Sequence, residues 1–453
     1  MNDLRTYMDQ LANRPGNLLT TEVSVDPKLE LTRIVYMLEK QNKRPAVFFK
    51  KVRGSDLPVL TNLFGNRERL ALAMDTTEEK LNQVYREREK RPIPPVIVAS
   101  GPIQERVMTG DEVDLTRFPI VHHNSGDAGP YITAGVTTVK DPDTGIRNAG
   151  MYRFMLRNRN QLSVYLAEAN HVYYIYRKYC EKKQNMPIAI TIGAHPVFYL
   201  GSLSFGSIDT DEYAVIGGLS GGAMQVVKCK SVDLEVPASG EICLEGYIDW
   251  EKREPEGPFG ELHTLYGETM NQPVVTITAV TMRHDPIYHD VCSGDVEHQL
   301  MGGIPRLGQI YNQVKVACPG IRDVYMPPSG YCRTACYVSI KKYVEGEPAN
   351  GAAAVFSADP FVRHAVFVDE DVNIFDDYEV LKAVNLNMDI SKCFIIHNAK
   401  GSQIDPASRS GVVTKIGIDA TRPLKSKFAR INFNEGIGGI DLAKIFKNSA
   451  VKL

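Results

Sequence analysis

The chain has 453 residues, a mass of 50.4 kDa, 43% hydrophobic and 23% charged residues, and a formal net charge of −2. This length exceeds the size at which a single hydrophobic core stops growing, so we expect two or three domains. The composition is typical of a globular protein, and the near-neutral charge argues against a nucleic-acid partner.

The sequence gives no indication of a membrane or secreted protein. It has no run of roughly 18 apolar residues that would span a bilayer. Its first ten residues, MNDLRTYMDQ, lack the apolar stretch of a signal peptide. Eight cysteines, none of them spaced CxxC, predict reduced thiols and no cysteine-ligated cluster. We therefore expect a cytoplasmic protein that acts on a small molecule.

Residues 1–98 have the pattern of a small α/β domain. Helical periodicity covers residues 3–11, 26–40, 67–74 and 77–90, and short apolar runs at 46–49 and 58–64 predict strands. The proline-rich segment 91–95 marks the end of this domain.

Residues 99–305 change to short strands separated by Gly, Pro and Asp. Examples are 132–139, 224–228 and 273–280, with helices predicted at 171–183 and 211–219. This spacing predicts an antiparallel β-barrel with inserted helices.

After residue 306 helices and strands alternate again. A connecting helix at 310–317 precedes predicted strands at 337–340 and 365–368 and a helix at 378–384. Residues 306–453 are therefore expected to form this connecting helix and a second α/β domain.

Glycine-rich segments give little support for nucleotide or hydrolase chemistry. Neither 217–222 nor 436–439 matches GxGxxG between a strand and a helix, and no GxxxxGK[ST] motif occurs. Residues 218–222 match GxSxG, but they follow a predicted helix and precede a strand, the reverse of a nucleophile elbow.

Three other segments contain residues suited to binding and proton transfer. The first, 148–153, places Asn148 and Arg153 five residues apart. An asparagine in this position often closes a hairpin, and an arginine there often lies on a solvated strand face. However, an arginine also binds a carboxylate through two parallel hydrogen bonds and keeps its charge.

The second segment, 209–213, contains Glu212 at a predicted helix start, and His171 begins another predicted helix. Acids at this position stabilise a helix through its dipole, and a histidine at a helix start is commonly a cap or a packed core residue. Carboxylate, amide and imidazole groups are also ligands for Mn²⁺ or Mg²⁺.

The third segment, Pro255-Glu256-Gly257-Pro258-Phe259-Gly260-Glu261, fixes two carboxylates in a Gly/Pro turn. Surface acids in such a turn are normally solvated. If they are buried together, one carboxylate raises the pKa of the other, as a proton donor requires.

In this order, NxGxxR, the acidic turn and PEGPFGE resemble the UbiD family of prenylated-flavin (prFMN) decarboxylases, with further similarity at 62–74, 234–246 and 415–421. The resemblance covers nearly the whole chain. It implies an N-terminal α/β domain, a central split β-barrel like that of flavin reductases, and a C-terminal α/β oligomerisation domain. It also implies a homo-oligomer, either a dimer or a hexamer.

The resemblance also implies roles for individual residues. Arg153 would face the cofactor and the substrate carboxylate, Glu256 would pair with Arg153, and Glu261 would donate the proton that replaces CO₂. Asn148, His171 and Glu212 would hold Mn²⁺ or Mg²⁺ against the cofactor phosphate, and K⁺ would bind nearby. The residues expected at the cofactor are Asn148, Met151, Tyr152, Arg153, Asn170, His171 and Lys415.

The implied reaction is a reversible, non-oxidative decarboxylation of an aromatic or heteroaromatic acid, with the cofactor supplied by a flavin prenyltransferase. His298 and Arg306, eight residues apart across a glycine pair, resemble the furan-2,5-dicarboxylate branch, where such a pair holds the second carboxylate. A core histidine with a surface arginine is the simpler interpretation. A phenolic or hydroxybenzoate substrate, or a non-catalytic flavin-binding subunit, are the alternatives.

Overall fold

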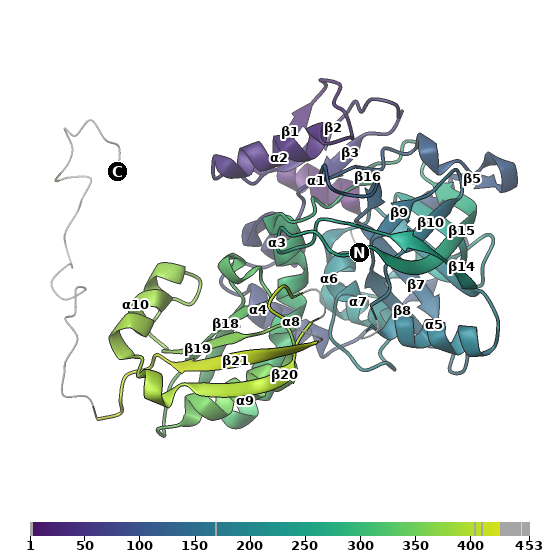
Figure 1. The fold of residues 1–453 in the computed structure, drawn as a ribbon. Helices are drawn as coiled ribbons and strands as arrows, with labels where there is room; N and C mark the ends of the chain where they lie inside the picture. The colour runs from purple at the N-terminus through teal and green to yellow at the C-terminus, as the bar shows by residue number, and fades with distance from the viewer. Residues whose placement is uncertain (1–2, 168–169, 403–404, 409–410, 426–444, 446–453) are drawn as a thin grey trace.

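The computed structural model describes residues 3–167, 170–402, 405–408, 411–425 and 445 (Figure 1). The fold is a mixed α/β arrangement of three parts in chain order. Among the described residues, no helix is long and apolar enough to cross a membrane.

The N-terminal part is a small sheet covered by helices. Its elements are α1 (Leu4–Ala12), β1 (Leu18–Thr21), α2 (Glu30–Lys40), β2 (Ala46–Phe49), β3 (Val59–Thr61), α3 (Arg67–Ala73) and α4 (Leu81–Glu89). The sheet order is β1-β2-β3-β16, so its last strand, β16 (Tyr288–His289), comes from a segment more than 200 residues later. This pairing ties the N-terminal part to the centre of the molecule.

The predicted helices and strands of this part are confirmed, although α2 and α4 each begin four residues later than predicted. α1 illustrates why the helices of this part could be predicted from the sequence. Asp3 caps the helix by accepting a hydrogen bond from the Thr6 amide, and Leu4, Tyr7 and Leu11 are buried on one face.

The central part contains a nine-stranded antiparallel sheet. Its strands are β5 (Arg106–Thr109), β6 (Tyr131–Ile132), β7 (Gly135–Lys140), β8 (Arg147–Met151), β9 (Phe154–Leu156), β10 (Gln161–Val164), β11 (Met186–Ile192), β14 (Ile242–Glu256) and β15 (Met270–Met282). The order is β6-β9-β10-β15-β14-β11-β7-β8, with β5 paired to β15. A three-stranded sheet, β13-β12-β4, accompanies it, formed by β4 (Val96–Ile97), β12 (Gln225–Lys228) and β13 (Glu235–Pro237).

The prediction of a β-barrel is not confirmed, because β6 and β8 do not pair among the described strands and the sheet stays open. Closure is a contact between strands at opposite ends of the order, and local strand patterns carry no information about it. Three helices are inserted between the strands, α5 (His171–Glu181), α6 (Pro196–Ser202) and α7 (Glu212–Ser220).

The connection to the C-terminal part is a single long helix, α8 (Val296–Ala317), which lies between the two parts in Figure 1. We expected a helix only from residue 310, after a glycine break, and this expectation was wrong. Gly302, Gly303 and Pro305 all lie inside α8. The two glycines are buried and allow close approach, since added Cβ atoms would lie 2.1 Å from Arg333 Nη2 and 2.8 Å from Cys332 Cβ.

The C-terminal part is a five-stranded mixed sheet with helices α9 (Glu347–Ala358) and α10 (Asp377–Asn387). The strands are β17 (Ile321–Tyr325), β18 (Ala335–Ile340), β19 (His364–Asp369), β20 (Phe394–Lys400) and β21 (Val412–Asp419), in the order β17-β18-β19-β21-β20. One hydrophobic core runs through all three parts, and it includes Leu70, Phe198, Leu300 and Val338.

Candidate active site

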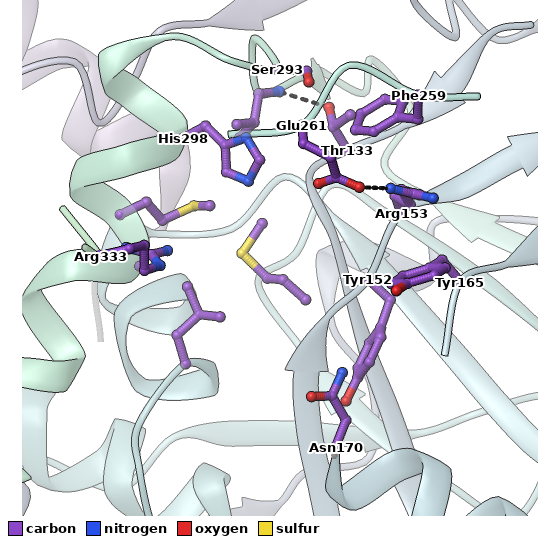
Figure 2. A pocket seen from close by; sticks show the side chains of 15 residues that line it. Thr133, Tyr152, Arg153, Tyr165, Asn170, Phe259, Glu261, Ser293, His298 and Arg333 are labelled. Carbon is purple, nitrogen blue, oxygen red and sulfur yellow. Dashed lines mark hydrogen bonds and ion pairs between the residues drawn. The ribbon is translucent and has the colours of Figure 1, made fainter. Parts of the chain in front are cut away.

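Two adjoining cavities, of about 200 and 240 Å³, lie between the central sheet and α8. Figure 2 shows the first, with Arg153 and Tyr165 on one side and His298 and Arg333 on the other. The two cavities share six lining residues, namely Met151, Tyr152, Asn170, Leu203, Gly302 and Arg333. They therefore form one elongated space. We call the first cavity the reactive lobe and the second cavity the metal lobe.

Arg153 and two glutamates meet in the reactive lobe. Arg153 Nε and Nη2 donate to the two carboxylate oxygens of Glu256 at 2.9 and 2.8 Å, and Nη1 donates to Glu261 (Figure 2). The guanidinium lies 4.3 Å from the ring centre of Tyr165 and 4.9 Å from that of Phe259. The arginine is thus fixed by two ion pairs and two cation–π contacts.

The charges in this group determine its protonation. Burial alone lowers the pKa of Arg153, but the hydrogen bonds from Glu256 and the charges of both glutamates outweigh it and raise that pKa. Glu256 is fully buried and Glu261 is 7% exposed. One fixed positive charge is therefore shared by two carboxylates, and Glu261 is the carboxylate that lines the cavity.

The backbone around PEGPFGE explains how the two acids converge. Glu256 is the last residue of β14, and Gly257 follows with a φ of 89°, a conformation that favours glycine. The returning loop is held by the Gly260 amide, which donates to Asp127 at 2.8 Å, and by the Glu261 amide, which donates to the Leu265 carbonyl at 2.8 Å. The turn therefore directs Glu261 back toward Arg153.

Asn148, His171 and Glu212 all line the metal lobe. Asn148 lies on β8, and Glu212 and His171 begin α7 and α5. The Glu212 carboxylate accepts from Asn148 Nδ2 at 3.0 Å and from the Ala149 amide at 2.8 Å. The structure brings the three expected metal ligands to one cavity.

The donor set suits a hard divalent cation. Burial raises the pKa of Glu212 to about 8, partly offset by the two hydrogen bonds, and no basic side chain forms an ion pair with it among the described residues. Burial also lowers the pKa of His171, so its imidazole is neutral and able to coordinate. A buried carboxylate beside an amide and a neutral imidazole would be stabilised by Mn²⁺ or Mg²⁺.

The other residues expected at the cofactor divide into two groups. Met151, Tyr152 and Asn170 line both lobes. Lys415 lies on β21 and lines neither lobe, because its Nζ donates to the carbonyl of Pro360 at 3.0 Å inside the C-terminal part. The structure thus accounts for Lys415 without a phosphate.

His298 and Arg306 are not brought together. Both lie on α8, but eight residues of helix separate them by about 12 Å along the axis. His298 lines the reactive lobe, whereas Arg306 lines the metal lobe and pairs with Asp359 at 2.5 Å. Burial, reinforced by nearby positive charges, lowers the pKa of His298 to about 3, so the ring is neutral at physiological pH.

Arg333 is the residue that the sequence analysis missed. It lines both lobes and is 7% exposed, and Nη1 donates to the carbonyls of Gln299 and Cys332 at 3.1 and 2.8 Å. Burial and the charge of Arg306 lower its pKa to about 9. Arg333 forms no ion pair with an acid in the described part of the chain. The available signal in the sequence was a lone arginine between two cysteines, a residue type that is usually buried, in Cys332-Arg333-Thr334-Ala335-Cys336.

Comparison with known proteins identifies the family. Three family models match consecutive parts of the chain, described as the N-terminal, Rift-related and C-terminal domains of 3-octaprenyl-4-hydroxybenzoate carboxy-lyase. They cover residues 10–88, 96–296 and 299–420. The anhydromevalonate phosphate decarboxylase of Methanothermobacter thermautotrophicus is 34% identical over 95% of this chain and 100% of its own length. That of Methanosarcina mazei is 36% identical over 93% of this chain and 97% of its own.

Solved structures agree with this assignment. The UbiD-class enzyme HmfF from Pelotomaculum thermopropionicum, in complex with FMN, has a TM-score of 0.92 and 36% identity, covering 98% of this chain and 100% of that one. An evolved dimeric form of HmfF in complex with prFMN has a TM-score of 0.90 at 34% identity, over 98% and 100% of the two chains. The apo 3,4-dihydroxybenzoic acid decarboxylase AroY from Klebsiella pneumoniae also has a TM-score of 0.90, at 25% identity over the full length of both chains. The chain belongs to the UbiD family of carboxy-lyases.

Proposed function

We propose that this chain uses prFMN, held with Mn²⁺ or Mg²⁺ and K⁺, to decarboxylate a small unsaturated acid that carries a second anionic group. The observation that carries the proposal is the position of Arg333, a buried cation without an acidic partner in the described residues, opposite Arg153 and Glu261 across the reactive lobe (Figure 2). Two cations at opposite walls suit a substrate with two anions.

The residues of the reactive lobe provide orientation and proton transfer. Arg153 would bind the carboxylate that is lost, while Glu256 holds the guanidinium in place through its two hydrogen bonds. Glu261 would deliver a proton to the carbon that CO₂ leaves, since it lines the cavity and a positioned acid is needed there. When bound, prFMN supplies the electron sink for breaking the carbon–carbon bond.

The metal lobe would hold the cofactor phosphate. Asn148, His171 and Glu212 would ligate the divalent ion. Met151, Tyr152 and Asn170 line the passage between the lobes, where the ring system of the cofactor would lie. Arg306 would stabilise this end of the site through its pairing with Asp359, instead of binding substrate.

The second anion would bind Arg333, with neutral His298 as a hydrogen-bond partner. A charge-assisted hydrogen bond contributes about 1.5–3 kcal/mol, which corresponds to roughly a ten- to hundred-fold preference over a monoacid. This revises the expectation from sequence, in which Arg306 held that anion, because Asp359 already neutralises Arg306.

Similarity to the relatives makes a phosphate the expected second anion. Two of them, matched over 95% and 93% of this chain, are anhydromevalonate phosphate decarboxylases. Furan-2,5-dicarboxylate is the alternative with a carboxylate in that place. A phenolic acid would bring no second anion to Arg333. A non-catalytic flavin-binding subunit would have no need for the intact contacts of Arg153 with both glutamates.

The test is CO₂ release by protein co-produced with a flavin prenyltransferase. Anhydromevalonate phosphate, furan-2,5-dicarboxylate, furan-2-carboxylate and 4-hydroxybenzoate would be compared by kcat/KM. We expect the phosphorylated acid to react fastest and the monoacids slowest. Arg333→Leu should remove the preference for a second anion without releasing cofactor. A wild type that prefers 4-hydroxybenzoate would contradict the proposal.

A further inference from the structure

A second group of metal-ligating side chains lies away from both lobes, between the two sheets of the central part. Cys243 and Glu245 are two residues apart on β14 and therefore project from the same face. Cys229 follows β12 of the small sheet. Both Sγ atoms and a carboxylate oxygen of Glu245 lie within 4.8 Å of one another.

Glu245 has an unusual environment for a buried acid. It is fully buried, and its Oε2 accepts three hydrogen bonds, from the amides of Lys230 and Ser231 at 2.7 Å each and from Ser231 Oγ at 3.1 Å. Its Oε1 is also buried and has no hydrogen-bond partner, and no basic side chain pairs with Glu245 among the described residues. A buried carboxylate oxygen without a partner is rare and destabilising, so a missing cation would explain it.

We propose that Cys229, Cys243 and Glu245 form a binding site for a thiophilic divalent cation, with Zn²⁺ as the physiological candidate. Two thiolates and a carboxylate are common zinc ligands. Around a tetrahedral zinc with bonds of about 2.0–2.3 Å, neighbouring ligand atoms lie roughly 3.5–3.8 Å apart. The three ligand atoms lie within 4.8 Å of one another, so they would draw together by at most about 1.3 Å to reach these values.

The surroundings fit a site that is built and accessible. The rest of Glu245 is already fixed by the 230–231 backbone, so the carboxylate needs no reordering to bind. Cys229 is half-buried, whereas Cys243 is fully buried, so an ion would enter from the Cys229 side and could keep a water as fourth ligand. The bound ion would fasten the 229–234 turn to β14, the strand that ends at Glu256.

Binding would convert both thiols to thiolates. Each sulfur–metal bond replaces a sulfur–hydrogen bond, so one divalent ion releases two protons, and its affinity should rise with pH. The hydrogen bond with Cys229, together with burial, raises the pKa of Cys243, which extends this dependence to higher pH. A disulfide between the two cysteines would need an external oxidant and would leave Glu245 Oε1 without a partner.

The experiment is a titration of the reduced, chelator-treated, full-length protein with Cd²⁺ under anaerobic conditions. Thiolate-to-metal charge transfer in the ultraviolet reports cysteine ligation specifically, so an ion at Asn148, His171 and Glu212 would not contribute. We expect the absorption to saturate at one Cd²⁺ per chain, to be lost when a large excess of Zn²⁺ displaces the Cd²⁺, and the loaded protein to have a higher melting temperature. Cys229→Ser and Cys243→Ser should abolish the absorption, and Glu245→Gln should weaken binding tenfold or more.

Cys393→Ser and Cys180→Ser, which remove half-buried cysteines elsewhere, are the matched controls and should bind as the wild type does. Circular dichroism would verify that each variant is folded. If Cys243→Ser does not fold, Cys229→Ser still provides the test, because Cys229 is only half-buried. No charge-transfer band in the wild type, an unchanged band in Cys229→Ser, or a Cys229–Cys243 disulfide with no metal uptake after reduction would each overturn the proposal.

Discussion

A Cβ atom on Gly302 would lie 2.1 Å from Nη2 of Arg333, so the side chain of Arg333 occupies the space that a larger residue on α8 would fill. The contact explains why a glycine stands at a buried position inside a 22-residue helix, where it normally destabilises. It also makes the position of Arg333 dependent on a residue with no side chain of its own.

Gly302→Ala should therefore displace Arg333 and reproduce the effect of Arg333→Leu. Nη2 is the end of a flexible side chain, so the arginine is expected to move while the helix is kept. The kcat/KM for a substrate with two anions should fall by roughly ten- to hundred-fold, and that for a monoacid should change little.

The double variant Gly302→Ala/Arg333→Leu provides the control. If both changes act through the same guanidinium, the double variant should be no worse than Arg333→Leu alone. Additive losses would show that Gly302 acts by another route.

Glu212→Gln should lower metal content and flavin content together, because in the proposed ligand set this carboxylate would contribute the negative charge. Metal stoichiometry and flavin absorbance would be measured on one purified sample. Asp211→Asn is the matched control, since Asp211 caps the same helix and pairs with Arg147 but lines neither lobe. Full retention of metal and flavin in Glu212→Gln would remove Glu212 from the ligand set.

The buried, neutral His298 should make the free energy of unfolding fall at acid pH. Its folded pKa of about 3 lies below the usual 6.5, so between these values the unfolded chain binds a proton that the folded chain does not. This difference destabilises the fold as the pH falls through that window, by about 2 kcal/mol at pH 5. His298→Gln should gain about that much on the wild type when urea unfolding at pH 7.5 and pH 5 is compared. An unchanged difference between the two proteins would contradict the buried neutral state.

The sequence predicted most of the helices and strands, because single amphipathic segments such as α1 carry their own periodicity and cap. The resemblance to the UbiD family, through NxGxxR and PEGPFGE, implied that Arg153 would pair with Glu256 near Glu261, and the structure brings the three together. The residues alone did not predict this, because acids in a Gly/Pro turn are normally solvated. The sequence did not predict that β16 is a strand of the N-terminal sheet, because the pairing of β16 with β3 joins residues far apart in the chain.

The substrate side of the cavity was harder to predict for the same reason. His298 and Arg306 were predicted from their resemblance to the furan-2,5-dicarboxylate branch, but in this structure their separation along α8 places them in different lobes. Arg333 reaches the cavity from beyond α8, and its proposed role depends on a packing contact with Gly302. Long-range packing of this kind leaves no periodic signal in the sequence.

The most direct test of the account is proton delivery by Glu261. Wild type, Glu261→Gln and a control variant, Glu251→Gln, would be prepared with equal prFMN content; Glu251 is an exposed acid on β14 that lines neither lobe. Turnover of the preferred acid and deuterium incorporation from D₂O into the product would be measured together. We predict that Glu261→Gln loses about 10²–10⁴-fold in turnover while keeping its cofactor, and that Glu251→Gln matches the wild type. Wild-type turnover and deuterium incorporation in Glu261→Gln would contradict the account.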